Sequence, residues 1–290
     1  MRIIENLSDI SQNYDAVFCD LWGCLHNGVT AFPDAVEALR AYKAQGGIVI
    51  LLTNSPKPKS HVIPQLDSLN VPSDCWDDIA TSGDSAQAAM VSGQFGQKVF
   101  HMGPERDLPF FTDLAEDLTS ETDISRTDLE SAEGIIATGL VNDETETPED
   151  YRAQLLYAKT NGMKMLCANP DVVVDRGDKR VYCAGALAQL YAEMGGEVSF
   201  VGKPHPPIYD LARRRLSAIR NIPEDRILAI GDGPATDVKG ALGEDLDCLF
   251  ITGGLAAEAT GTNTQPDPAK LEQFLEQEKL APTFSIGFLR

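Results

Sequence analysis

The sequence has no long hydrophobic run, and this absence excludes several classes of protein. Its longest apolar stretch, Ile48 to Leu52, is far shorter than the ~18 residues that a membrane-spanning helix needs. The N-terminal segment is interrupted by Glu5 and Asp9, which leaves no hydrophobic core of a signal peptide. We therefore expect a cytoplasmic protein with no membrane partner.

Positive charge is also scarce. The chain has 24 Lys and Arg against 44 Asp and Glu, a net charge of −20 at pH 7. A field of this sign repels polyanions at ordinary salt concentrations. We therefore expect no nucleic-acid partner, and acidic metal sites can account for part of the excess.

The six cysteines form no Cys-x-x-Cys pair and have no histidine at a zinc-site spacing. A zinc site or a disulfide framework is therefore poorly supported. Reduced cysteines in the core of a cytosolic protein are the simpler interpretation.

What the chain does contain is the composition of a globular protein, with 43% hydrophobic and 23% charged residues. Its 290 residues exceed the length of one typical domain, which is about 100 to 150 residues. Two domains, or one domain with a large insertion, are expected.

The first part of the chain predicts a βαβ unit. Residues 14–20 form a short, continuously apolar strand that ends in Asp20, a helix begins at Pro33 and stops near Gly46, and a second apolar strand covers 48–53. Continuous apolar strands indicate a parallel sheet covered on both faces.

The same pattern returns after Val201. A helix begins at Pro206, a strand over 226–232 ends in Asp232, and a helix over 235–242 precedes a strand over 247–252.

Between these halves lies a region with strand-like pieces at 98–102, 134–138 and 164–168. The predicted fold class is therefore α/β, a doubly wound Rossmann-like parallel-sheet core with an inserted α/β cap domain. We place the core at residues 1–79 and 199–290 and the cap at 80–198.

Polar residues follow four of the predicted core strands. They are Asp20, Thr53-Asn54, Lys203, and the pair Asp232 and Asp237. Ligands of open parallel sheets bind at the carboxyl ends of the strands, so these side chains are expected to meet. Carboxylates suit Mg²⁺, while Thr and Lys suit phosphate oxygens. Each residue alone has an ordinary structural explanation, but their joint occurrence in this order favours a phosphoryl site.

Four segments carry a more specific signal. They are Asp20-Leu-Trp-Gly-Cys-Leu, Leu-Leu-Thr53-Asn54-Ser, Gly-Lys203-Pro-His-Pro and Gly-Asp232-Gly-Pro-Ala-Thr-Asp237. In this order the chain resembles the haloacid dehalogenase superfamily, and specifically its class IIA, NagD-like branch. Ala-Asn169-Pro-Asp171 and Cys183-Ala-Gly-Ala-Leu also look like the cap of that branch, which lies between the second and third segments.

The resemblance implies a role for each motif residue. Asp20 is the nucleophile that becomes an aspartyl phosphate, Thr53 and Asn54 belong to the catalytic set, and Lys203 offsets charge on the nucleophile and phosphate. Mg²⁺ is held by Asp20, the Trp22 carbonyl, Asp232 and Asp237. Asn169 and Asp171 bind the substrate, and a homodimer is compatible with the resemblance. The set is coherent because a carboxylate and a phosphate repel each other unless positive charge lies between them.

One position departs from the family pattern. Phosphatases of this superfamily usually have a second Asp two residues after the nucleophile as general acid and base, and here that residue is Trp22. An indole N–H cannot exchange a proton near neutral pH. General acid–base catalysis contributes roughly 10²- to 10⁴-fold in rate. His26 and His205 are candidate substitutes because both lie near motif residues and titrate near neutral pH.

The favoured function is therefore a Mg²⁺-dependent hydrolase, a phosphatase of a small phosphorylated metabolite such as a sugar phosphate. A second interpretation is a phosphate- and metal-binding protein with weak or no turnover because of Trp22. A third, displacement at carbon as in a dehalogenase, would not need the phosphate-and-metal set that includes Thr53, Lys203 and Asp232.

Overall fold

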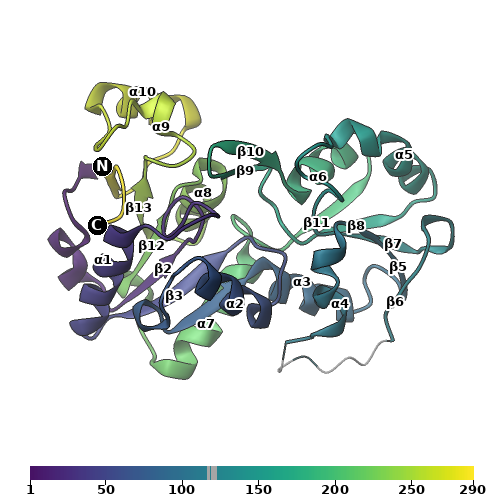
Figure 1. Ribbon diagram of the computed structural model, residues 1–290, viewed down its shortest axis with the longest axis horizontal. Helices are drawn as coiled ribbons and strands as arrows, with labels where there is room; N and C mark the ends of the chain where they lie inside the picture. Colours follow the sequence, from purple (N-terminus) through teal and green to yellow (C-terminus); the bar gives the residue numbers. More distant parts are fainter. Residues whose placement is uncertain (116–117, 119–122) are drawn as a thin grey trace.

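The computed structural model describes residues 1–115, 118 and 123–290. Most of its strands form two parallel sheets that lie side by side (Figure 1). The larger one, here called the core sheet, has the order β1-β14-β13-β12-β2-β3-β4, and all its neighbouring strands are parallel. Its strands are β1 (Arg2–Ile3), β2 (Ala16–Cys19), β3 (Ile48–Thr53), β4 (Asp78–Thr81), β12 (Ile227–Gly231), β13 (Asp247–Ile251) and β14 (Phe284–Ile286).

Helices cover both faces of the core sheet. They are α1 (Pro33–Ala44), α2 (Lys59–Ser68), α7 (Pro206–Ile219), α8 (Lys239–Gly243), α9 (Ala257–Thr260) and α10 (Pro268–Glu278). Successive side chains of a strand point to opposite faces. Val17 of β2 therefore packs in one cluster with Leu39 of α1, while its neighbour Phe18 packs in another with Ile208 of α7. This two-sided burial explains why the strands are apolar without alternation.

The smaller sheet, here called the cap sheet, is built from the middle of the chain in the order β11-β8-β7-β5-β6. Its strands are β5 (Lys98–Met102), β6 (Ser125–Arg126), β7 (Gly134–Ala137), β8 (Lys164–Cys167) and β11 (Glu197–Phe200). The helices of this region are α3 (Ser82–Val91), α4 (Pro109–Thr112), α5 (Arg152–Thr160) and α6 (Ala184–Glu193). An antiparallel hairpin, β9 (Val173–Arg176) and β10 (Lys179–Tyr182), lies above the junction of the two regions in Figure 1.

The predicted fold class, a doubly wound parallel core with an inserted α/β region, is confirmed. The inserted region begins after β4, the last core strand before it. Its last strand, β11, pairs with β8 as far as Phe200, which lies opposite Cys167. The boundaries 1–79, 80–198 and 199–290 stay a prediction. No helix within the described ranges is long and apolar enough to cross a bilayer.

Two local features differ from the sequence prediction. The helix expected over 235–242 begins as a π-helical turn, Pro234–Val238, because both Asp237 N and Val238 N donate to Gly233 O. The hairpin over 173–182 was not predicted, because its exposed second strand has no apolar alternation.

Candidate active site

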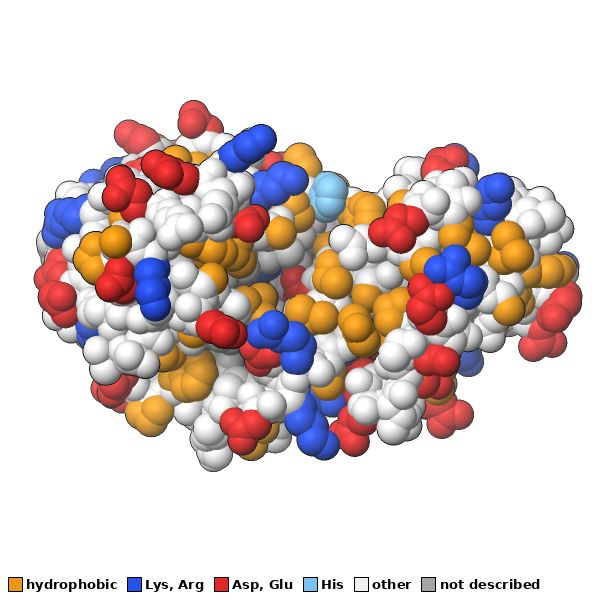
Figure 2. Space-filling model, turned by 90° about the horizontal axis from the view of Figure 1, so that it is seen from above, with side chains coloured by type: hydrophobic (Ala, Val, Ile, Leu, Met, Phe, Trp, Pro, Cys, Tyr) orange, Lys and Arg blue, Asp and Glu red, His pale blue; other side chains and the backbone are white. Residues whose placement is uncertain are grey.

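A cavity of about 330 Å³ lies between the core sheet and the cap sheet, where the surface is hollowed in Figure 2. Asp20 follows β2 and Asp232 follows β12, while Asn169 and Asp171 follow β8 of the cap sheet. The carboxyl ends of both parallel sheets thus face one space, which is where ligands of such sheets bind.

Lys203 is the buried cation of this cavity, with only 2% of its side chain exposed. Its Nζ donates to Asp20 Oδ1 at 2.5 Å, to Asp237 Oδ1 at 2.6 Å and to Leu52 O at 2.9 Å. All three ammonium hydrogens therefore have acceptors. Burial opposes the charge, but the Asp20 and Asp237 carboxylates outweigh it and hold the pKa of Lys203 well above its ordinary value.

The acidic residues near Lys203 outnumber it. Burial raises the pKa of Asp20 well above its ordinary value, although Lys203 lowers it. Burial, followed by repulsion from Asp237, raises the pKa of Asp232 to about 8. The carboxyl groups of Asp20, Asp232 and Asp237 thus lie near a single buried ammonium. A divalent cation would relieve the repulsion that remains between them.

The surroundings of Asp232 fit a metal ligand. Its Oδ2 accepts a hydrogen bond from Leu255 N at 3.0 Å. A Cβ atom at Gly23, whose φ is +77°, would lie 2.2 Å from Asp232 Oδ2, and one at Gly254 would lie 1.8 Å from it. Glycine at both positions therefore keeps open the space beside this carboxylate, and Gly23 also adopts a backbone conformation that other residues rarely take.

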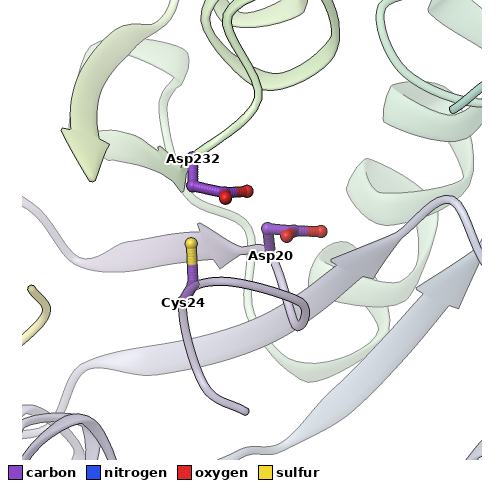
Figure 3. Close-up of side chains that lie close together, drawn as sticks. All are labelled: Asp20, Cys24 and Asp232. Carbon is purple, nitrogen blue, oxygen red and sulfur yellow. The ribbon is translucent and has the colours of Figure 1, made fainter. Parts of the chain in front are cut away.

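Cys24 joins this group, since its sulfur and single carboxylate oxygens of Asp20 and Asp232 lie within 4.8 Å of one another (Figure 3). Burial raises the pKa of the Cys24 thiol well above its ordinary value, so the sulfur stays protonated. The charged donors are carboxylate oxygens, which suit a hard cation such as Mg²⁺ better than a soft one.

The second motif contributes two residues in different ways. Thr53 is 1% exposed and lines the cavity, and its Oγ1 accepts from Ser55 N at 3.1 Å. Asn54 is buried, and the cavity lining formed by the described residues does not include it. Its Oδ1 accepts from Lys203 N at 2.7 Å, and its Nδ2 donates to Asp171 Oδ1 at 2.8 Å. Asn54 therefore connects the loop of Lys203 to the loop of Asp171.

Asn169 and Asp171 both line the cavity, in the loop that follows β8. Asn169 Oδ1 accepts from Asp171 N at 3.0 Å, which fixes the turn between them. Burial raises the pKa of Asp171 to about 6, against the opposing effects of Lys203 and Asn54.

Trp22 also lines the cavity. Its ring meets the His26 ring edge-on, with centroids 5.2 Å apart, and a Cβ at Gly28 would lie 2.2 Å from the indole. The indole is therefore packed into the loop after β2.

Neither histidine considered as a substitute acid belongs to the cavity lining within the described residues. His26 is fully buried, its Nδ1 accepts from Gly28 N at 3.0 Å, and burial lowers its pKa to about 4. His205 stacks on Phe200 with centroids 5.2 Å apart. The hypothesis that either histidine replaces the missing acid is not supported by this geometry.

The end of the cavity nearest β5 and β7, here called the cap end, was missed from sequence. It is lined by Lys57, Arg106, Asp107, Thr138, Asp143 and Arg176. Asp143 accepts from Arg106 at 2.7 Å and from Arg176 at 2.8 Å. Part of the signal was available, because Thr138 directly follows β7 just as Asp20 directly follows β2, while Asp107 lies five residues beyond the end of β5.

Comparisons with known proteins agree with this geometry. Residues 17–115 match a family described as haloacid dehalogenase-like hydrolase, and residues 200–276 match a second, HAD-hydrolase-like family. A crystal structure of a hydrolase of the haloacid dehalogenase-like family from Brucella suis is 40% identical, with a TM-score of 0.87. That match covers 99% of this chain and 100% of the other. No curated protein matches.

Two more distant structures have the same fold. A possible sugar phosphatase from Cytophaga hutchinsonii is 18% identical, with a TM-score of 0.77, and the match covers 99% of this chain and 98% of the other. A glycerol phosphate phosphatase from Mycobacterium tuberculosis, in complex with magnesium, is 21% identical, with a TM-score of 0.65. The latter match covers 95% of this chain and 76% of the other.

Proposed function

Because the chain belongs to the haloacid dehalogenase-like family of hydrolases, we propose that it is a Mg²⁺-dependent phosphatase of a small phosphorylated metabolite. The family resemblance predicted from the four motifs is confirmed, with the inserted region between the second and third of them, as in the class IIA branch. Hydrolysis is thus established for the family, and the phosphate monoester is our proposal.

The observation that carries the proposal is the position of Lys203. Its ammonium lies between Asp20 and Asp237, while Thr53 lines the same cavity with a hydroxyl. Displacement at carbon would need the nucleophile but not a group of further acids that can hold a metal ion. A phosphoryl dianion needs both, because its charge must be offset as it approaches a carboxylate.

In the proposed reaction Asp20 attacks phosphorus and the bond to the leaving oxygen breaks. Lys203 offsets negative charge on Asp20 as the phosphate approaches, and the Thr53 hydroxyl donates to a phosphoryl oxygen. Water then hydrolyses the aspartyl phosphate and restores Asp20. The cap-sheet side of the cavity covers the non-phosphate part of the substrate and limits its contact with water.

Mg²⁺ would be held by Asp20, Asp232 and the Trp22 carbonyl, with Asp237 in support, and would supply positive charge against the developing phosphate charge. Asp237 already binds Lys203 and, through Oδ2, Gly233 N at 3.0 Å. We therefore assign it a supporting role.

A second candidate function rests on Trp22, which occupies the place of the usual general acid in the cavity lining. This second candidate is a protein that binds phosphate and metal without appreciable turnover.

The two candidates are tested with a panel of phosphorylated sugars, polyols and aryl alcohols, incubated with purified protein with and without Mg²⁺. We expect phosphate release that requires Mg²⁺ and stops with a chelator. Binding of phosphate with Mg²⁺ but no release from any substrate would favour the second candidate.

Asp232→Asn is expected to weaken metal binding more than it alters the chemistry. The amide keeps the size of the side chain but removes one negative charge from the ligand set. The Mg²⁺ concentration for half-maximal activity should rise by at least about tenfold, since even indirect partners of metal ligands are worth 10- to 100-fold. A titration of activity with Mg²⁺ measures this shift.

The matched control is Asp210→Asn, which removes the same charge from the exposed surface of α7. It should leave the Mg²⁺ titration unchanged. A defect in Asp232→Asn that no concentration of Mg²⁺ improves would argue against Asp232 as a ligand.

A further inference from the structure

We propose that Asp171, in the loop after β8, gives a proton to the leaving oxygen and takes one from the attacking water, the role that Trp22 cannot perform. This inference rests on the proposed phosphatase function. It assigns to Asp171 a catalytic role in addition to the substrate contact implied by the family resemblance.

The position of Asp171 suits this role. Its Oδ1 accepts from Asn54 Nδ2, and Asn54 Oδ1 in turn accepts from the backbone of Lys203, so the carboxyl group is tied to the loop that carries the catalytic cation. Asp171 enters the cavity from the cap-sheet side. In an in-line displacement the leaving oxygen lies opposite the attacking Asp20, and this side of the cavity therefore meets it.

The charged groups nearest in effect to Asp171 are those of the end of the cavity that holds Asp20 and Lys203, where the phosphoryl group would bind. Lys203 attracts its carboxylate, and Asp237 and Asp232 repel it, while the neighbouring thiols of Cys167 and Cys183 are neutral. A pKa near 6, raised by burial, lets the group both donate and accept a proton near neutral pH.

Three other acids in the described part of the chain line the cavity outside the four motif segments, and their partners distinguish them from Asp171. Asp143 is held by two arginines, and Asp175 pairs with Arg180 on the hairpin at 2.8 Å. Asp107 is the closest competitor, since it is buried and burial raises its pKa. Its charged neighbours, however, are Arg106, Lys57 and Asp143, all at the cap end.

The proton balance closes over one turnover. As Asp20 forms its bond to phosphorus, the bond to the leaving oxygen breaks and that oxygen takes the proton of Asp171, which releases an alcohol. The resulting Asp171 carboxylate accepts a proton from the water that attacks the aspartyl phosphate. Inorganic phosphate and the Asp20 carboxylate are released, and Asp171 is protonated again.

Asp171→Asn tests the proposal because the amide oxygen can still accept from Asn54 but has no proton to transfer. The readout is kcat/KM for alkyl and aryl phosphates plotted against leaving-group pKa. For the unchanged protein we expect a shallow dependence. For Asp171→Asn, alkyl phosphates should lose roughly 10²- to 10⁴-fold, while aryl phosphates with acidic leaving groups should lose less than about tenfold. Aryl substrates should also show a burst of phenol, because the aspartyl phosphate then accumulates.

Asp107→Asn is the matched comparison, with the same change in a buried cavity acid. A steeper leaving-group dependence in Asp107→Asn than in Asp171→Asn would assign the proton to Asp107 and overturn the proposal. An equal loss for alkyl and aryl substrates in Asp171→Asn would also overturn it, because a residue that only positions Asn54 affects both alike. If Asp171→Asn does not fold, Asp171→Ser, which replaces the carboxyl group by a smaller polar side chain, takes its place in the same comparison.

The experiment gives a different result if the proposed phosphatase function itself is wrong. A protein that releases phosphate from no substrate, before any substitution, would overturn both proposals at once. Normal turnover with an unchanged leaving-group dependence in Asp171→Asn would overturn this inference alone.

Discussion

Replacing Asp20 by Asn is expected to abolish turnover, with less than about 1% of the original kcat remaining, because an amide does not attack phosphorus and loss of a nucleophile usually costs several orders of magnitude. The fold should be preserved. An Asn side chain has the size of Asp, and its oxygen can still accept from Lys203 Nζ, as Asp20 Oδ1 does at 2.5 Å. Steady-state phosphate release at saturating Mg²⁺ measures the effect.

Thermal unfolding serves as the control for this substitution. Asp237 still pairs with Lys203 when Asp20 loses its charge, so the ammonium stays compensated and the melting temperature should be unchanged. Asp210→Asn, on the exposed surface of α7, should keep full activity. Substantial phosphate release by Asp20→Asn with an intact fold would contradict a covalent mechanism at this residue.

Lys203→Met should have the second largest effect, and it should act on stability as well as on activity. Methionine roughly fills the space of the aliphatic stem but removes the ammonium that Asp20 and Asp237 share. Removing one partner of a buried ion pair typically costs about 3 to 5 kcal/mol of unfolding free energy, because the remaining charge stays buried without compensation. Denaturant unfolding measures this loss, and kcat should fall at least about 100-fold with the loss of charge stabilisation.

A double substitution separates the two contributions. Lys203→Met combined with Asp20→Asn removes the cation and one acid together, so the loss of stability should be smaller than the sum of the single effects. Its activity should stay as low as that of Asp20→Asn. Additive stability effects would mean that the 2.5 Å contact contributes no coupling, contrary to our account of the site.

The core of the fold was predictable because its signals are local. The strand predicted over 48–53, apolar from Ile48 to Leu52, is β3 in the structure, and the helix predicted to begin at Pro33 begins there. A strand buried on both faces and a proline at a helix N-terminus each leave a mark in a few adjacent residues. The short strands β1 and β6 leave too few residues to show any period.

The motif side of the site was also predictable. Asp20, Thr53, Lys203 and Asp232 were each expected at a strand end, and all of them line one cavity. This succeeds because the carboxyl ends of parallel strands meet at one edge, wherever the strands lie in the sequence. Their catalytic and metal-binding roles stay predictions that the substitutions above address.

The sequence by itself therefore determined the fold class, the family and the four motif segments that meet at the core-sheet edge. Only the tertiary structure decided which residues of the inserted region face that edge, because the cap-sheet strands are brought opposite the core by contacts between distant parts of the chain. It decided that Asn54 joins Lys203 to Asp171, and that His26 is buried away from the cavity. It also set the acidity of two cavity carboxyl groups, because burial and neighbouring charges, which no local pattern encodes, separate a pKa near 6 at Asp171 from one near 8 at Asp232.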